Sequence, residues 1–350
     1  MTEQLFGFGI TLVAGTIGFW LFRLIRFPAA AMLGSMSATA LLGITGWVPP
    51  FNGGPLSFVC GVGIGIFLGR QINRRVLCSV KSMLRPVLVQ IGCLLLLSLG
   101  LGYIFYLMDS GKGMPLGTAL VSTSTGGLTE MMVFGLSIGG DVGVIAFVQL
   151  FRIITFLSLI PYSAKLAKRL GDKRSPVKSD DCLNLTKFSC PQYVLLVFTA
   201  FAGAYIGLRL EIPAGSLLGA MCFSGALAML LNRKYEYKYA IRYAAQIGLG
   251  MVMGQRIDSG ILSRLASLFL PVLGITAVML LGCLLLAFIQ YKTTRYDLTT
   301  CLMCSSPAGL SQIAIYAEEA GADVFTISVF HTARLVSIVI IYPWLIMHLI

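Results

Sequence analysis

Two arginines and two aspartates occupy matching positions inside apolar stretches of the sequence. Arg152 follows Asp141 by eleven residues, and Arg334 follows Asp323 by the same interval. An ionisable side chain within a membrane is a candidate functional group, because its burial is costly unless it is paired. The arginines could bind a substrate carboxylate, or each could only hold a neighbouring polar segment in place. The aspartates could couple charge, but we favour a role in capping the helices that follow them.

A polar motif rich in small residues precedes each aspartate. A helix that is broken at glycines exposes backbone N–H groups and the positive end of a helix dipole, and both suit an anionic ligand. In the alternative interpretation, the small residues only let helices pack closely. The candidate substrate-binding residues are Ser124, Thr125, Gly126, Gly127 and Thr129 in the first motif, and Ser305, Ser306, Gly309, Ser311 and Gln312 in the second.

Glu130 ends the first motif, where the second motif has the neutral Gln312. A carboxyl group at membrane depth can carry a proton or bind a cation, because it changes charge or attracts one in an apolar setting. Glu130 is therefore the best single candidate for a group that couples transport to a proton or a cation.

The composition indicates a membrane protein. Apolar residues make up 57% of the 350 residues, charged residues only 11%, and the mean hydropathy is +0.87. An ordinary soluble domain carries about 25% charged residues. The net charge of +12 comes from residues between apolar segments, which favours membrane orientation over nucleic-acid binding. No metal or other cofactor is expected, because the chain has only two histidines, His331 and His348.

The chain is an internal duplication, since five landmarks recur in the same order. The pairs are 27–34 with 212–219, 63–69 with 248–254, 124–130 with 306–312, 140–142 with 322–324, and Arg152 with Arg334. The first membrane repeat is predicted at 1–163, a polar linker at 164–191 and the second membrane repeat at 192–350. The glycine rows within 63–69 and 248–254 are expected to be packing surfaces.

Each repeat is expected to contain five spans and one irregular segment. The predicted spans are 5–22, 29–47, 56–70, 86–108 and 142–162 in the first repeat, and 193–208, 213–231, 243–254, 269–290 and 324–349 in the second. The irregular segments are 114–139 and 298–321, each with polar and small residues at its centre. A re-entrant hairpin fits them, and one unwound helix that crosses once is the alternative.

The distribution of positive charge favours opposite orientations for the two repeats. If the irregular segments are re-entrant and both termini lie outside, most of the 26 Lys and Arg residues face the cytoplasm together with the 164–191 linker. If each segment crosses once, the charges are split far more evenly. The predicted fold is an all-α integral membrane protein of two inverted repeats, each with five transmembrane helices and one re-entrant or broken helical hairpin.

These duplicated motifs together resemble the AbrB-type family of polytopic membrane proteins. The resemblance rests on the Pro28 and Pro213 segments, the two Gly-Leu-containing polar motifs, and the spans with Arg152 and Arg334. It covers nearly the whole chain and implies a protein of about this length with the same duplication. Members are labelled as ammonia monooxygenase or as regulatory protein. The family shares its name with a small DNA-binding regulator that this chain does not resemble.

The predicted function is a secondary transporter in the bacterial inner membrane that works by alternating access and is coupled to an ion or a proton. An organic anion is favoured as the substrate, because arginines and half-helix N-termini both attract anions. A membrane-bound regulator that affects gene expression without transport is the alternative, and an enzyme is not expected. The expected partners are the lipid bilayer and a small-molecule or ion substrate, with a homodimer left open and nucleic acid not expected.

Overall fold

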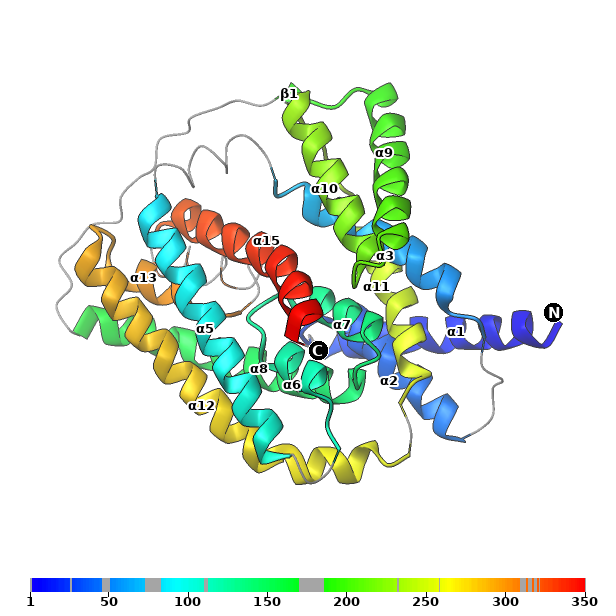
Figure 1. The fold of residues 1–350 in the computed structure, drawn as a ribbon, viewed down its shortest axis with the longest axis horizontal. Coiled ribbons are helices and arrows are strands. Elements are labelled where there is room, and N and C mark those ends of the chain that lie inside the picture. The colour runs from blue at the N-terminus through cyan, green and yellow to red at the C-terminus, as the bar shows by residue number, and fades with distance from the viewer. Residues whose placement is uncertain are drawn as a thin grey trace. The chain divides into compact units, whose positions relative to one another are not determined.

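The computed structural model describes residues 2–25, 27–45, 51–72, 83–109, 113–169, 186–231, 233–257, 259–308 and 322–349, together with 313, 317 and 320. Within these residues the chain is helical apart from one pair of two-residue strands (Figure 1). The helices are α1 (Thr2–Leu24), α2 (Ala30–Thr45), α3 (Gly54–Gly69), α5 (Leu84–Met108), α6 (Leu116–Thr123), α7 (Leu128–Ser137), α8 (Val142–Arg169), α9 (Cys190–Arg209), α10 (Gly215–Leu230), α11 (Tyr239–Gly254), α12 (Ile261–Thr293), α13 (Leu298–Ser305) and α15 (Val324–Leu349). The strands β1 (Thr186–Lys187) and β2 (Arg233–Lys234) pair in parallel.

Every predicted span coincides with a helix. In the described part of the chain, six helices are long and apolar enough to cross a membrane, namely α1, α5, α8, α9, α12 and α15. Helices α2, α3, α10 and α11 have 16 residues each. A helix of that length spans about 24 Å, which is less than the roughly 30 Å of a bilayer's hydrocarbon core. The set of helices fits a multi-pass membrane protein.

Several helix boundaries differ from the prediction, most of all at α12 and at the two helices that flank the linker. Helix α12 begins at Ile261 rather than 269 and continues through Pro271. A proline inside a helix removes one backbone hydrogen bond and crowds the carbonyl of the preceding turn, and helices within a membrane tolerate this where neighbouring groups satisfy the freed backbone. Helix α8 extends to Arg169, into the predicted linker, and α9 begins at Cys190 behind a capping box formed by Ser189 and Gln192. Residues 170–185 of the linker lie outside the described residues.

The helices form two compact units that do not coincide with the two sequence repeats. The first unit contains Met1–Asn73, Leu128–Ala146 and Leu185–Ser267. The second contains Arg74–Gly127, Phe147–Asn184 and Leu268–Ile350. Each unit therefore combines helices from both repeats. The first holds α1–α3 with their repeat counterparts α9–α11, and the second holds α5, α6 and most of α8 with α12, α13 and α15.

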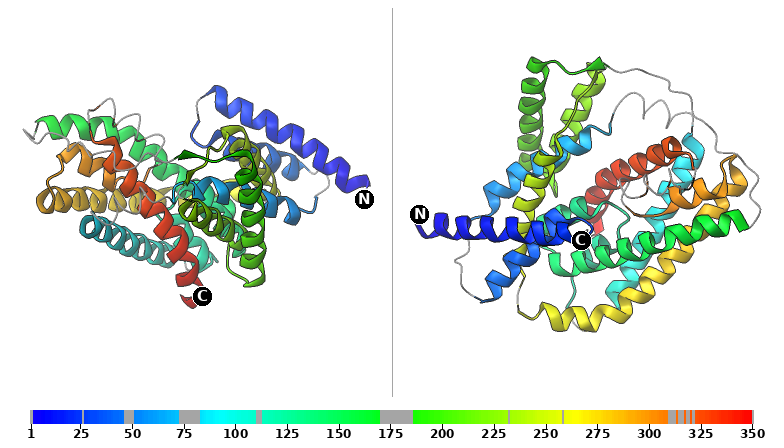
Figure 2. Two further views of the ribbon diagram at one scale, coloured as in Figure 1. Left: turned by 90° about the horizontal axis from the view of Figure 1, so that it is seen from above. Right: turned by 180° about the vertical axis from the view of Figure 1, so that it is seen from behind.

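In the first unit, the first two helices of each repeat pack through glycines. A Cβ atom added to Gly203 would lie 2.5 Å from the carbonyl oxygen of Gly219, and Gly207 approaches Gly215 in the same way. The equivalent pair in the first repeat is Gly18 with Gly34. Helices α9 and α10 consequently lie side by side and run in opposite directions, as Figures 1 and 2 show. Glycine permits this approach because it lacks a side chain.

The second helix of each repeat packs on the third helix of the other repeat. A Cβ atom at Gly65 would lie 2.5 Å from the Leu217 carbonyl oxygen, and Gly69 approaches Met221 farther along α10. Along these contacts the residue numbers increase in both helices, so α3 and α10 run in the same direction. Helices α11 and α2 repeat this arrangement, with Gly250 beside Met32 and Gly254 beside Met36 (Figure 1). The glycine rows are thus packing surfaces in this unit.

The third helices of the two repeats, α3 and α11, also contact each other. A Cβ atom at Gly63 would meet the Ala245 side chain, whereas one at Gly248 would meet the Cys60 side chain. The residue numbers therefore run in opposite senses along the two helices at this contact. Residues 60 and 245 are repeat equivalents, as are 63 and 248. Exchanging the two repeats therefore turns the contact between 63 and 245 into the contact between 248 and 60.

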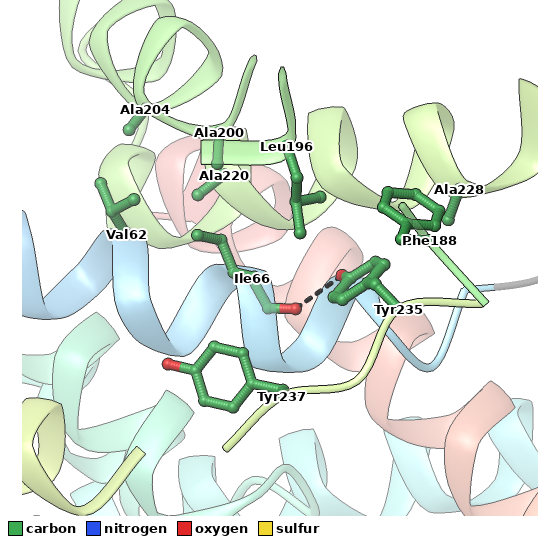
Figure 3. Close-up of a cluster of buried hydrophobic side chains, with 10 residues drawn as sticks. All are labelled: Val62, Ile66, Phe188, Leu196, Ala200, Ala204, Ala220, Ala228, Tyr235 and Tyr237. Carbon is green, nitrogen blue, oxygen red and sulfur yellow. Dashed lines mark hydrogen bonds between the residues drawn. The ribbon is translucent and has the colours of Figure 1, made fainter. Parts of the chain in front are cut away.

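Tyr235 and Tyr237 fix the connection between α10 and α11 onto α3. The Tyr235 hydroxyl donates to the Ile66 carbonyl at 2.7 Å, within a cluster that includes Phe188 and Leu196 (Figure 3). The Tyr237 hydroxyl donates to the Gly63 carbonyl, also at 2.7 Å. Burial raises the pKa of Tyr237 to about 12, so its hydroxyl keeps the proton that it donates.

In the second unit, buried polar side chains connect α5 with the helices around it. Gln90 donates to the carbonyl of Cys304 at 2.9 Å and accepts from Gln290 of α12 at 2.9 Å. The Ser98 hydroxyl lies 2.9 Å from that of Tyr342 on α15. Hydrogen bonds between apolar helices fix their rotation as well as their distance. These contacts hold α6 and α13, the short helices that carry the candidate site.

Candidate functional site

The first polar motif breaks a helix. Helix α6 ends at Thr123, residues 124–127 are not helical, and α7 begins at Leu128. Ser124 has an extended backbone, with φ −59° and ψ 140°, and its hydroxyl donates to the Val121 carbonyl at 2.8 Å. Serine hydroxyls that bond nearby carbonyls compete with helix continuation. We call residues Ser124–Gly127 the first helix break. The division between the units falls after Gly127, so this break lies in the second unit.

Arg152 and Gln149 of α8 bind the carbonyl groups of the first helix break. Arg152 donates from Nη1 to the Ser124 carbonyl and from Nη2 to the Gly126 carbonyl, the latter at 3.2 Å. Gln149 donates from Nε2 to the carbonyls of Val121 at 3.0 Å and Ser124 at 3.1 Å. Its Oε1 accepts from Arg152 Nη2 at 2.7 Å. The side chains therefore satisfy the carbonyls that a helix end leaves without an intrahelical partner.

The second polar motif also interrupts its helix. Helix α13 begins at its N-cap Asp297, which accepts from the Thr300 N–H at 2.9 Å, and ends at Ser305. Residues Ser306–Ala308 are not helical, and we call them the second helix break. Of the predicted binding residues, Gly309, Ser311 and Gln312 lie outside the described residues. Ser305 belongs to the last turn of α13, where its hydroxyl donates to the Cys301 carbonyl at 2.9 Å.

Arg334 and His331 of α15 hold the second helix break as Arg152 and Gln149 hold the first. Arg334 donates from Nη1 to the Ser306 carbonyl at 2.8 Å and from Nη2 to the Ala308 carbonyl at 3.3 Å. His331 Nε2 lies 2.9 Å from the Met303 carbonyl, and its Nδ1 lies 3.3 Å from Arg334 Nη2. Because a carbonyl only accepts and a guanidinium only donates, these partners require a neutral histidine protonated on Nε2.

Four hydrogen bonds of the first break have counterparts at the second, whereas the bond from Gln149 to the Ser124 carbonyl and the bond from the Ser124 hydroxyl to the Val121 carbonyl are described at the first break alone. Met303 is the repeat equivalent of Val121, and Ser306 and Ala308 are those of Ser124 and Gly126. Both arginines are buried, with 2% of Arg152 and 4% of Arg334 exposed. A guanidinium at the carbonyl end of a helix is also stabilised by the helix dipole. The geometry thus gives both arginines the structural role of holding the helix breaks, through their Nη atoms.

The Nε atoms of the two arginines do not take part in holding the helix breaks. Arg152 Nε and Arg334 Nε are buried and have no hydrogen-bond partner in the described structure. The hydroxyls of Thr125 in the first break and Ser306 in the second share this property. Each break therefore combines a satisfied set of carbonyls with one guanidinium N–H and one hydroxyl that remain available.

Asp141 and Asp323 cap the helices that carry the arginines. Asp141 Oδ1 accepts from the N–H groups of Gly143 at 3.0 Å and Val144 at 3.1 Å, at the start of α8. Asp323 Oδ1 accepts from the N–H groups of Phe325 and Thr326, at the start of α15. Asp141 also forms an ion pair with Arg264 at 3.0 Å. A carboxylate here stabilises the N-terminal N–H groups and complements the helix dipole.

Thr129 and Glu130 lie in the first unit, at the start of α7. The Thr129 hydroxyl accepts from Gln246 Nε2 of α11 at 3.0 Å. Glu130 is 8% exposed and lies on α7, which contacts α11, the helix that carries Arg242. Arg242 also lies over the Phe67 ring at 4.3 Å from its centroid. The buried carboxyl group of Glu130 remains a candidate for proton or cation coupling.

The residues Gln149, His331 and Gln246 were missing from the predicted site. The repeat alignment carried a signal for two of them, because Gln149 and His331 are equivalent and each precedes its arginine by three residues. That spacing places the pair on one helix face. Gln246 has no such signal, since its contact with Thr129 joins segments that lie far apart in the sequence.

The fold and the site define a helical membrane protein whose duplicated halves each contain a helix broken at polar residues and held by a buried arginine. The family model described as "Transition state regulatory protein AbrB" matches residues 1–166 and 53–350. The chain belongs to this AbrB family.

Two relatives are similar along most of their length. "Putative regulator AbrB" of Escherichia coli (strain K12) is 26% identical over 339 residues, which cover 92% of this chain and 90% of the relative. "Uncharacterized protein YhjN" of Bacillus subtilis (strain 168) is 22% identical over 298 residues, which cover 80% of this chain and 75% of the relative. These names state a regulatory role for one relative and no activity for the other.

Proposed function

We propose that this protein is a secondary transporter of a small organic anion, coupled to a proton or another ion, in the bacterial inner membrane. The observation that carries the proposal is the matched pair of helix breaks, each held by an arginine that binds equivalent carbonyls. Irregular backbone at membrane depth is tolerated where protein buries it or where it lines a cavity. Paired discontinuous helices in duplicated halves are typical of secondary transporters.

The helix directions in the first unit support an inverted repeat. Helix α2 runs with α11 and α10 runs with α3, whereas α3 and α11 run in opposite senses. It follows that α2 and its counterpart α10 point in opposite directions, and the same holds for α3 and α11. This argument uses packing contacts alone and agrees with the orientation that the positive charges favour. Opposed halves are the arrangement in which one rocks against the other during alternating access.

The preference for an anion rests on the charge of the two breaks. Arg152 and Arg334 are buried, and in the described part of the chain all of their hydrogen bonds go to neutral groups. A buried positive charge without an acidic partner is costly, and an anionic ligand would offset that cost. Glu130, in the other unit, is the carboxyl group that we assign to coupling.

A regulatory role without transport is the second candidate, favoured by the name of the Escherichia coli relative. The two candidates make different demands on the membrane protein. A transporter moves solute across a sealed bilayer that contains no other protein, whereas a regulator needs a further component to act on. Regulation could also follow from transport, through the solute that is moved.

A ligand-stabilisation screen followed by uptake tests the proposal. A solute that binds the folded state raises the melting temperature of the purified protein. An organic anion found in this way should accumulate in proteoliposomes, and the double variant Arg152→Gln/Arg334→Gln should abolish uptake when it is assayed under conditions in which circular dichroism shows it to be folded. Normal uptake by that variant would contradict the assignment of the arginines. Failure of every stabilising anion to enter proteoliposomes would contradict transport.

Accessibility labelling tests the orientation. Single cysteines placed near both termini should react with an impermeant reagent added outside intact cells, whereas cysteines in the 164–191 linker should not. A C-terminus on the same side as the linker would contradict the inverted repeat.

A further inference from the structure

Buried polar atoms without a hydrogen bond are concentrated at the two helix breaks. In the part of the chain that the structure describes, seven buried side-chain nitrogen or oxygen atoms lack a partner. Four of them belong to the breaks or to the arginines that hold them: Thr125 Oγ1, Arg152 Nε, Ser306 Oγ and Arg334 Nε. Folded proteins contain few such groups, and each one calls for an explanation.

All four atoms can donate a hydrogen bond. The Nε atom of arginine is only a donor, and a hydroxyl donates as well as accepts. The carbonyl oxygens of Ser124, Gly126, Ser306 and Ala308, by contrast, already accept from Arg152, Gln149 or Arg334. The sites consequently offer donors and positive charge, which suit an anion rather than a metal cation.

The donor groups of the first break and those of the second break lie in the same compact unit. Both breaks and both arginines belong to the second unit. Tyr342 of α15, about two helical turns after Arg334, donates to the Leu120 carbonyl of α6 at 3.5 Å. Helix α15 therefore contacts the helix that leads into the first break. Two buried guanidinium groups whose described hydrogen bonds all go to neutral groups create a local preference for negative charge.

We propose that the second unit binds a small dianion with two separate anionic groups, a dicarboxylate in chemical class. One carboxylate is received by Arg152 Nε and the Thr125 hydroxyl, and the other by Arg334 Nε and the Ser306 hydroxyl. This inference rests on the proposed transport function and names its substrate class. The duplication explains the matched arginines, whereas the two hydroxyls stand at neighbouring repeat positions.

A ligand with both anionic groups has an advantage over two separate anions. Once its first carboxylate is bound, the second is held near its own site at a high effective concentration. Two monocarboxylates must each lose translational freedom to reach the same state. The site therefore selects by the number of anionic groups and by the distance between them.

Thermal shift measurements with defined probes test the dianion. Succinate should raise the melting temperature of the purified full-length protein at concentrations about 100-fold lower than propionate, at equal ionic strength and pH. The series malonate, succinate, glutarate and adipate should show an optimum length. Equal effects of succinate and propionate would overturn the proposal, as would equal effects along the series.

Substitutions at the two helix breaks test where the dianion binds. Arg152→Gln and Arg334→Gln should each weaken succinate binding by about tenfold or more, because each removes a charge-assisted hydrogen bond. Thr125→Val and Ser306→Ala should weaken it by a smaller factor. They remove no side-chain hydrogen bond of the folded protein, so they keep the test decisive if the arginine variants fail to fold.

Arg209→Gln provides the matched control, since Arg209 is exposed and its side chain bonds Tyr205 within the same helix. The control should bind succinate as the unmodified protein does. Unchanged succinate affinity in Thr125→Val and Ser306→Ala would overturn the assignment. Succinate that binds as described but never enters proteoliposomes would contradict transport alone. Uptake of propionate without a preference for succinate would contradict the dianion alone.

Discussion

The two helix breaks use different residues to make the same hydrogen bonds. At the first break, Gln149 donates to the Val121 carbonyl and accepts from Arg152. At the second, His331 contacts the Met303 carbonyl and Arg334 in the same places. An amide cannot titrate near neutral pH, so the position requires a neutral group with one donor and one acceptor. The comparison assigns His331 to the support of the break rather than to proton transfer.

The breaks differ more in what surrounds them than in how they are held. The first break is followed by Glu130, whereas Gln312 is the equivalent residue after the second. The available hydroxyl belongs to Thr125 at the first break and to Ser306, one repeat position earlier, at the second. The carbonyl-binding arginines are thus the shared element, and the acid is specific to the first repeat.

The largest effect is expected from removing either arginine. Arg152→Ala or Arg334→Ala should lower the free energy of unfolding by about 3 kcal/mol or more, because each removes two charge-assisted hydrogen bonds to buried carbonyls. Lysine should not restore the loss, since it cannot make the forked contact. Denaturation in detergent measures the change, with Arg209→Ala as control. Tolerance of alanine at one break only would show that the two breaks are not equivalent.

A smaller loss of stability, similar at the two breaks, is expected from replacing Gln149 or His331, the neutral residues that contact the arginines. Gln149→Leu and His331→Leu should each lower the free energy of unfolding by about 1–3 kcal/mol, since each leaves a buried guanidinium N–H unpaired and removes one donor from a carbonyl that keeps another. The same denaturation measurement compares the two variants directly. A large loss of stability for one variant and none for the other would contradict the equivalence of the two helix breaks.

Replacing the available hydroxyls should hardly change stability. Thr125→Val and Ser306→Ala remove buried hydroxyl oxygens that have no hydrogen bond, so the free energy of unfolding should stay the same or rise by up to about 1 kcal/mol. Thermal unfolding without added anion measures this effect. A clear loss at either position would mean that the hydroxyl has a structural partner.

The smallest effect is expected from making the second break resemble the first. His331→Gln should change the free energy of unfolding by less than about 1 kcal/mol, because glutamine supplies the same donor and acceptor. The difference between this variant and the unmodified protein should also be flat from pH 5 to pH 8. A difference that varies across this range would show that His331 titrates, and would contradict the neutral role.

The sequence alone determined the membrane class, the duplication and the positions of the helices. Apolar segments of sufficient length are local features, and a repeat is visible without a structure. The helical interruption between Thr123 and Leu128 was also predictable, because Ser-Thr-Gly-Gly opposes helix continuation in the local chain. The alignment likewise paired Arg152 with Arg334. The hairpin path of the irregular segments and the repeat boundaries stay predictions.

The tertiary structure decided what those residues contact. Arg152 binds carbonyls 26 and 28 residues away, and Arg334 repeats the same separations. Sequence reasoning left open whether these arginines bound a substrate or held a segment, because spacing does not specify which of the guanidinium nitrogens has a partner. Only packing brings a helix end against a second helix, and this packing commits the Nη atoms to carbonyls and leaves the Nε atoms free to donate.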